Sequence, residues 1–320
     1  MKLIESKAEY IPQEECLEGI YKMIELAGRT AYHSQDKITP DSAKDFVDRM
    51  IKSKHGAALE AGTIYLRIPV DYKKIYEGNN YAGGTRIEFV EKCPYYKDNP
   101  YSKSHLIHLN SDMVYPNVLY GYNFKGGIEY QIVSTNYRVL IENNWLNDLQ
   151  YLCSPTESHE KRYTMRFITD VGVCRELLRH RVFSFLNEST RYCNYSNGKF
   201  GGEVTFISPS WYHHDPNVTW EDMKSANFRE ICKQTEAAYL NSIKNGATPQ
   251  EARQVLPFAT KTELIMTGFS SDWRHALDLR LFEKTGRVHP DMLDLMQKAQ
   301  KVMQEAGIWE DIMSKPSKFE

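Results

Sequence analysis

The sequence has few cysteines, no paired cysteine motif and little net charge. Only six of its 320 residues are cysteines, and no two of them form a CxxC pair, so neither a disulfide framework nor a zinc site is predicted. The formal net charge of −2 argues against a chain that binds DNA, RNA or an anionic membrane through its overall charge. An anionic ligand would therefore need a local cluster of basic residues.

Long apolar runs are also absent. No window approaches 18 uninterrupted apolar residues, and the N-terminal segment MKLIESKAEYIP is charged where a signal peptide would be apolar. We therefore expect a cytoplasmic protein with free thiols and without a membrane partner. Its hydrophobic content of 41% is enough to form a substantial core.

The spacing of apolar residues predicts mainly helices, with a few strands. No repeat and no linker rich in Pro, Gly or Ser divides the chain, so we expect a single domain over residues 1–320. Helices are predicted over residues 14–27, 41–54, 137–152, 173–178, 220–244, 259–283 and 290–306. Strands are predicted over residues 62–69, 162–169 and 204–207. Residues 70–130 are rich in Tyr, Asn, Gly and Lys and have weak periodicity, which suggests loops.

A cluster of basic and polar residues follows the short helix that is expected to end near residue 178. Arg179, His180 and Arg181 are consecutive, and their mutual repulsion is costly without an anion nearby. Taken alone, they could be solvated side chains that complement the negative end of a helix dipole. Ser189 and Arg191 follow within 13 residues and are two apart, so in an extended backbone they project to one side. A hydroxyl beside a guanidinium favours a loop that binds phosphate.

The segment RHRVFSFLNESTRY, residues 179–192, resembles the signature of the flavin-dependent thymidylate synthases. That signature is an RHR triplet, seven residues, and then a serine followed two positions later by Arg-Tyr. Further segments agree with the family in the same order along the chain: AGRTAY (27–32), KHGAALEAGT (54–63), TFISPS (205–210), ARQVLP (252–257) and ALDLR (276–280). The resemblance covers residues from about 20 to 300, except for about 68–160, which look like an insertion relative to shorter members.

The resemblance implies both a fold and a reaction. The expected fold is α+β, with a central antiparallel sheet flanked by helices, in a homotetramer whose flavin sites form between subunits. The expected reaction is the reductive methylation of dUMP to dTMP, with 5,10-methylenetetrahydrofolate as carbon donor and NADPH-reduced FAD as hydride source. Neither nucleic acid nor a metal ion is an expected partner.

The resemblance also assigns roles to individual residues. The side chains expected on FAD are Thr63, Arg179, His180, Arg181, Asn187 and His275. Those expected on dUMP are Glu176, Arg179, Glu188, Ser189, Arg191, Arg253 and Arg280. Several guanidinium groups suit two phosphate-bearing ligands, because Arg binds phosphate oxygens bidentately.

Arg280 and Ser189 are the candidate catalytic residues. Arg280 would face the uracil ring and favour its N3-deprotonated form, which raises the electron density at C5, the carbon that must attack. Ser189 has no evident general base near it in the sequence, which favours a phosphate ligand over a nucleophile.

The sequence departs from the family pattern around the expected flavin site. Ala61 stands where a histidine usually follows the Leu-Glu pair. Phe269 and Ser271 align with an asparagine and an arginine that help bind FAD, and His275 could supply part of that function. These changes make a non-catalytic nucleotide-binding relative conceivable.

Three departures concern the expected nucleotide site. Glu176 replaces a glutamine that would bind the pyrimidine, and Asn187 and Glu188 are displaced by one position toward Ser189. A second alternative is a related enzyme that uses the same flavin and folate chemistry but leaves another substituent, such as hydroxymethyl, on a uracil nucleotide. Only product analysis would separate it from a thymidylate synthase.

The other reactive side chains are predicted to lie in turns and loops and not to form a catalytic or metal site. A cysteine nucleophile for dUMP would need a low pKa, whereas Cys93 lies in KCPYYKDNP, which is typical of an exposed turn. His213, His214 and Asp215 lack the helical spacing of metal ligands and are predicted to form a polar loop.

Overall fold

The centre of the fold is a four-stranded antiparallel sheet in the order β2-β6-β9-β7. The computed structural model describes residues 1–69, 96–116, 123–212 and 220–319. The strands of the central sheet are β2 (Lys7–Tyr10), β6 (Arg162–Asp170), β9 (Lys261–Phe269) and β7 (Ser184–Asn187). The strand predicted over residues 162–169 is thus confirmed as β6.

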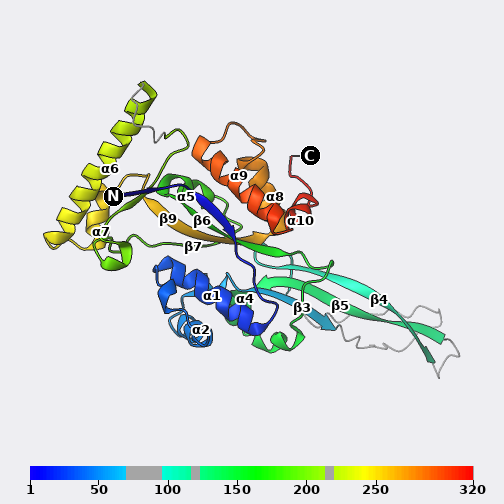
Figure 1. The fold of residues 1–320 in the computed structure, drawn as a ribbon. Coiled ribbons are helices and arrows are strands. Elements are labelled where there is room, and N and C mark those ends of the chain that lie inside the picture. Colours follow the sequence, from blue (N-terminus) through cyan, green and yellow to red (C-terminus); the bar gives the residue numbers. More distant parts are fainter. Residues whose placement is uncertain (70–95, 117–122, 213–219, 320) are drawn as a thin grey trace.

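Helices cover both faces of this sheet (Figure 1). One face carries α1 (Leu17–Ala31) and α2 (Ser42–Lys52). The other carries α8 (Ser270–Arg280), α9 (Pro290–Glu305) and α10 (Trp309–Met313). The α+β class with a flanked antiparallel sheet is confirmed, and so are the helices predicted near residues 14–27, 41–54 and 290–306.

The strand β9 lies between β6 and β7 and is buried on both faces. Leu264 and Met266 pack in the core formed with α8 and α9, whereas Ile265 packs against Met23 and Ala27 of α1. A strand with two buried faces has a continuous apolar run, which periodicity cannot distinguish from a buried helix. Our prediction of one helix over residues 259–283 is therefore wrong in its first half, and the helix α8 begins only at Ser270.

A second antiparallel sheet, in the order β3-β5-β4, extends away from the first (Figure 1). Its strands are β3 (Thr63–Pro69), β5 (Asn123–Asn136) and β4 (Lys103–Pro116). The predicted strand over residues 62–69 is confirmed. The loops predicted over residues 70–130 are wrong for 103–116 and 123–130, because pairing of β5 with both β3 and β4 organises sequence of weak intrinsic preference into strands. Residues 70–95, including Cys93, lie outside the described residues, as do 117–122.

The remaining elements connect these sheets. The helix α4 (Tyr137–Asn143) ends at Asn144, which adopts a left-handed φ of 60°, so the helix predicted over 137–152 is shorter than expected and a 3-10 turn, Leu146–Tyr151, follows it. The strand β1 (Lys2–Ile4) pairs in parallel with β8 (Thr205–Ile207). The other helices are α3 (Gly56–Leu59), α5 (Val171–Leu177), α6 (Trp220–Lys244) and α7 (Pro249–Ala252).

Two features of the described chain bear on its environment. None of its helices combines the length and apolar character needed to cross a membrane. The five cysteines that the structure describes are all free thiols.

Candidate active site

The helix α5 delivers the RHR triplet to the surface. The Asp170 carboxylate caps this helix by accepting a hydrogen bond from the backbone N–H of Val173 at 2.8 Å. Beyond the end of α5, Arg179 and Arg181 are exposed and His180 is buried. Within the described ranges, neither of the two guanidinium groups forms an ion pair. Two free cations beside each other are suited to bind an anionic ligand.

Arg280, the last residue of α8, joins this region from a distant part of the chain. Its Nε donates a hydrogen bond to His180 Nε2 at 3.1 Å. Its NH1 group donates to Glu176 Oε2 at 3.2 Å and completes an ion pair. The structure therefore brings together three of the residues that the sequence assigned to ligands, one of them to FAD and two to dUMP.

His180 is neutral at physiological pH. Burial and the neighbouring positive charge of Arg280 lower the pKa of His180 to about 4, and His275 contributes to the same effect. Because Nε2 accepts the hydrogen bond from Arg280, the ring proton is assigned to Nδ1. His180 can thus donate one hydrogen bond to a ligand but adds no charge.

Of the other three residues expected on FAD, Thr63 and Asn187 have their polar groups bonded within the protein, whereas His275 Nδ1 is buried without a hydrogen-bond partner among the described residues. The Thr63 hydroxyl is buried and accepts a hydrogen bond from Arg162 at 3.3 Å. The Asn187 amide donates to Cys174 Sγ at 2.7 Å. His275 stacks on Phe319, with 5.7 Å between ring centroids.

The residues at the three departures near the expected flavin site are all at least partly buried. Ala61 and Phe269 are core residues, with 2% and 1% of their surface exposed. Arg162 lies over the Phe269 ring at 5.4 Å, so this ring contacts a protein cation. The backbone N–H of Ser271 donates to Glu160.

The serine and arginine of the signature form a second group with Arg253. The backbone N–H of Ser189 donates to the carbonyl of Ala31 at 2.9 Å, which joins the signature to the end of α1. Arg253 NH1 donates to Thr190 Oγ1 at 2.9 Å. Arg191 is exposed and lies over the Tyr192 ring at 5.5 Å. The structure thus gathers Ser189, Arg191 and Arg253 around one loop.

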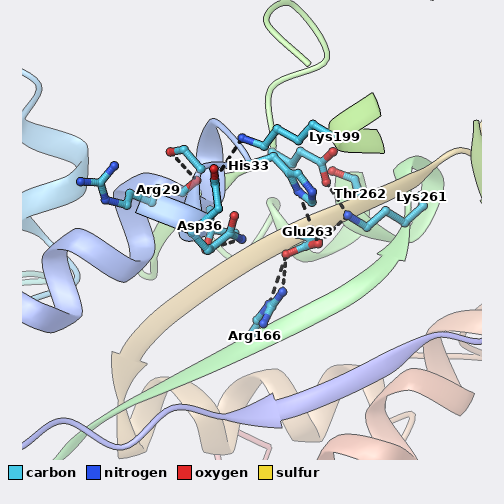
Figure 2. Close-up of polar contacts among 12 residues, drawn as sticks. Arg29, His33, Asp36, Arg166, Lys199, Lys261, Thr262 and Glu263 are labelled. Atoms are coloured by element: carbon cyan, nitrogen blue, oxygen red, sulfur yellow. Dashed lines mark hydrogen bonds and ion pairs between the residues drawn. The ribbon is translucent and has the colours of Figure 1, made fainter. Parts of the chain in front are cut away.

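Lys261, the first residue of β9, forms an ion pair with Glu188 that the sequence did not predict. The Lys261 ammonium lies 2.8 Å from Glu188 Oε2 and 2.5 Å from Glu263 Oε1. Figure 2 shows Lys261, Arg166 and His33 converging on Glu263. A signal was present in the sequence, because Lys261 and Glu263 lie on one face of a strand that contains no other charged residue.

Comparison with known proteins identifies the family. A family model described as "Thymidylate synthase complementing protein" matches residues 150–306. The probable flavin-dependent thymidylate synthase of Paramecium bursaria Chlorella virus 1 is 26% identical over 132 residues, which cover 40% of this chain and 61% of that protein. The flavin-dependent thymidylate synthase of Pyrococcus furiosus is 28% identical over 141 residues, which cover 44% of this chain and 52% of that protein.

The alignment does not extend over whole proteins. The chain spans about half to three fifths of the length of the first curated relatives it matches.

Among solved structures, the UMP/dUMP methylase PolB of Streptomyces cacaoi, bound with 5-Br dUMP, superimposes with a TM-score of 0.42 at 13% identity. The superposition covers 98% of this chain and 97% of that one.

The matched segment contains the RHR triplet, the Ser189 loop and the segments that carry Arg253 and Arg280. These are the residues that the structure gathers into the two groups described above. On this evidence, the segment of residues 150–306 belongs to the flavin-dependent thymidylate synthase family.

Proposed function

We propose that the protein is a flavin-dependent thymidylate synthase, a methyltransferase that converts dUMP to dTMP. The carbon donor would be 5,10-methylenetetrahydrofolate, and NADPH would reduce the flavin. The observation that supports this most directly is the contact between Arg280 and His180. It joins a residue expected on the uracil ring to a residue expected on FAD, as a reaction between the two ligands requires.

The residues around His180 fit a flavin dinucleotide in part. Arg179 and Arg181 are exposed cations without ion pairs in the described ranges, and they would bind its phosphates, while the Nδ1–H of His180 would donate to the same ligand. Thr63 fits less well, because its hydroxyl is buried and already bonded to Arg162. When bound, FAD would supply the hydride.

At the nucleotide, residues of this chain would bind the phosphate and polarise the uracil ring. Ser189, Arg191 and Arg253 would hold the phosphate of dUMP through a hydroxyl and two guanidinium groups. Arg280 would place a fixed positive charge beside the uracil ring, where negative charge develops. Glu176, which stands where the family has an amide, would anchor Arg280 through its ion pair.

We further propose a cytoplasmic homotetramer with sites between subunits. The free thiols suit a reducing compartment. Two exposed aromatic side chains, Tyr192 in the nucleotide loop and Phe258 beside α5, have 60% and 62% of their surface accessible in the monomer, and such groups are enriched in interfaces. Light scattering that shows a monodisperse monomer with bound FAD would count against this assembly.

The decisive experiment for the function begins with the colour of the protein. Protein purified with added FAD should show flavin absorbance bands, and anaerobic NADPH should bleach them. Turnover with dUMP and methylenetetrahydrofolate should then give dTMP. A colourless protein that does not take up FAD would favour the non-catalytic alternative, and another C5-substituted product would identify a related modifying enzyme.

A further inference from the structure

A buried ion pair lies directly beside the expected nucleotide loop. Glu188 immediately precedes Ser189, and 1% of its side chain is exposed. Lys261 reaches it from β9, with Nζ 2.8 Å from Oε2. A carboxylate taken out of water to this extent needs a partner of opposite charge. Lys261 supplies that charge.

The pair belongs to an ionic row across the central sheet (Figure 2). Lys261 also binds Glu263 Oε1, and Arg166 NH2 lies 2.6 Å from Glu263 Oε2. Burial alone would raise the pKa of Glu263, but Lys261 and Arg166 hold it below its ordinary value. Since Arg166 contributes to neutralising Glu263, the Lys261 charge remains available to Glu188.

Glu188 Oε1 is buried and accepts no hydrogen bond of standard geometry from any described residue. The side chains that face this carboxylate are Lys261, Glu263, His33, Cys193 and Tyr195. The Cys193 thiol interacts with the carboxylate, and the Tyr195 hydroxyl is itself buried without a partner among the described residues. The Cys193 thiol stays protonated, because burial and the charge of Glu188 raise its pKa to about 12. A buried acceptor without a donor is destabilising, and a hydrogen bond from a ligand would remove this cost.

The same surroundings argue against a metal ion as that ligand. His33, Glu188 and Glu263 offer one ligand atom each within 4.8 Å of one another. The Lys261 ammonium, however, already bridges the two carboxylates. A divalent cation would have to displace it and would lie beside the Arg166 guanidinium as well. The open acceptor is therefore suited to a hydrogen-bond donor.

We propose that Lys261 is a positioning residue of the nucleotide site. It fixes Glu188 Oε2 and so directs Oε1 to accept a hydrogen bond from a hydroxyl or N–H group of the bound uracil nucleotide. This inference rests on the proposed function, because it assumes that the nucleotide binds beside Ser189. It adds to that function a residue outside the signature, on the central strand of the sheet.

The test is a double-mutant cycle of Lys261→Met and Glu188→Gln, with dUMP affinity measured by calorimetry at neutral pH. Each single variant should bind dUMP about 10-fold or more weakly than the wild type, a loss of about 1.4 kcal/mol or more. The double variant should be no weaker than the worse single variant, because both changes remove one interaction. Lys261→Arg should restore part of the affinity.

The control is Lys298→Met, which removes another lysine from a partly exposed ion pair, with Asp294 on α9, and should leave dUMP affinity unchanged. Melting temperatures identify a variant that fails to fold. If Lys261→Met fails to fold, the dUMP affinity of Glu188→Gln alone tests the inference, because an amide cannot form the ion pair with Lys261.

The outcomes separate this inference from the proposed function. A wild-type protein that does not bind dUMP would refute the function. A wild type that binds dUMP while Lys261→Met binds it equally well, or losses that add fully in the double variant, would overturn the role of Lys261. Unchanged affinity in Glu188→Gln would do the same.

Discussion

Arg280 and His180, 100 positions apart in the sequence, meet through a hydrogen bond from Nε to Nε2 of 3.1 Å. The guanidinium is the donor, so the imidazole must present a lone pair and remain neutral. On the opposite side, Arg280 is held by Glu176. Its position is thus fixed by two residues of the α5 region before any ligand binds.

Arg280→Ala should lower turnover by about two to three orders of magnitude, a loss of about 3–4 kcal/mol in transition-state stabilisation. The reason is that its positive charge would act where negative charge develops on the uracil ring. FAD content should stay near the wild-type level, because Arg179 and Arg181 are unchanged. Tritium release from [5-³H]dUMP at saturating nucleotide measures the effect, and near-normal release would remove this electrostatic role.

Glu176→Gln should strengthen the action of Arg280. The carboxylate 3.2 Å from NH1 offsets part of the guanidinium charge, whereas an amide can still accept the hydrogen bond without that charge. We expect a rise in turnover of about 2- to 5-fold, since a partly exposed pair is worth about 1 kcal/mol or less. Steady-state rates at saturating dUMP check this. A fall in rate would show that the carboxylate itself is needed.

Ser189→Ala should weaken dUMP binding and retain turnover. A hydroxyl that only donates a hydrogen bond to phosphate or ribose contributes about 1–2 kcal/mol, so the affinity should fall about 5- to 30-fold. Titration of the flavin absorbance with dUMP measures it. Complete loss of tritium release at unchanged dUMP affinity would instead indicate covalent catalysis by Ser189.

His180 should make the protein sensitive to acid. The pKa of His180 is about 4 in the folded state and about 6.5 in the unfolded state. The unfolded state therefore binds more protons between these values, and stability falls as the pH drops from 6.5 toward 4. At pH 5 the loss is about 2 kcal/mol relative to pH 8. Urea unfolding at both pH values should show a smaller loss in His180→Gln, and an equal loss in the two proteins would contradict the prediction.

Gly268 is the position on β9 where an added methyl group should disrupt packing. A Cβ there would lie 2.4 Å from Cδ1 of Phe183, whose ring packs edge to face on Trp273. Gly268→Ala should lower the free energy of unfolding by about 1–3 kcal/mol. The matched control is Gly198→Ala, because no described atom lies within 4 Å of its Cβ. Similar stability in both variants would show that Phe183 can move aside.

Much of this architecture could be predicted from the sequence, and the exceptions have physical causes. The amphipathic helices α1, α2 and α9 were predictable because each buries one face and exposes the other. The strand β9 was not, because burial on both faces removes the alternation that identifies a strand. The strands β4 and β5 depend on pairing with each other and with β3, which no local pattern in residues 103–136 reveals.

The residues of the candidate site also divide into those that the sequence predicted and those that only the tertiary structure reveals. The sequence singled out the RHR triplet, Ser189 and Arg191 through one long motif, and Arg253 and Arg280 through two shorter segments, 252–257 and 276–280. It did not single out Lys261 and His33, because they reach Glu188 only after β9 and the end of α1 come together. The hydrogen bond from Arg162 to the Thr63 hydroxyl could not be predicted either, because the two residues meet only in the tertiary structure.

The central position of β9 also determines when the sheet can form during synthesis. Arg166 of β6 and Glu263 of β9 are 97 positions apart, so β6 leaves the ribosome long before its main partner. Until β9 emerges, β6 can pair only with the four residues of β2, and its other edge remains open to pairing with a second chain. Chaperone capacity during translation should therefore influence the yield of folded protein in a cell.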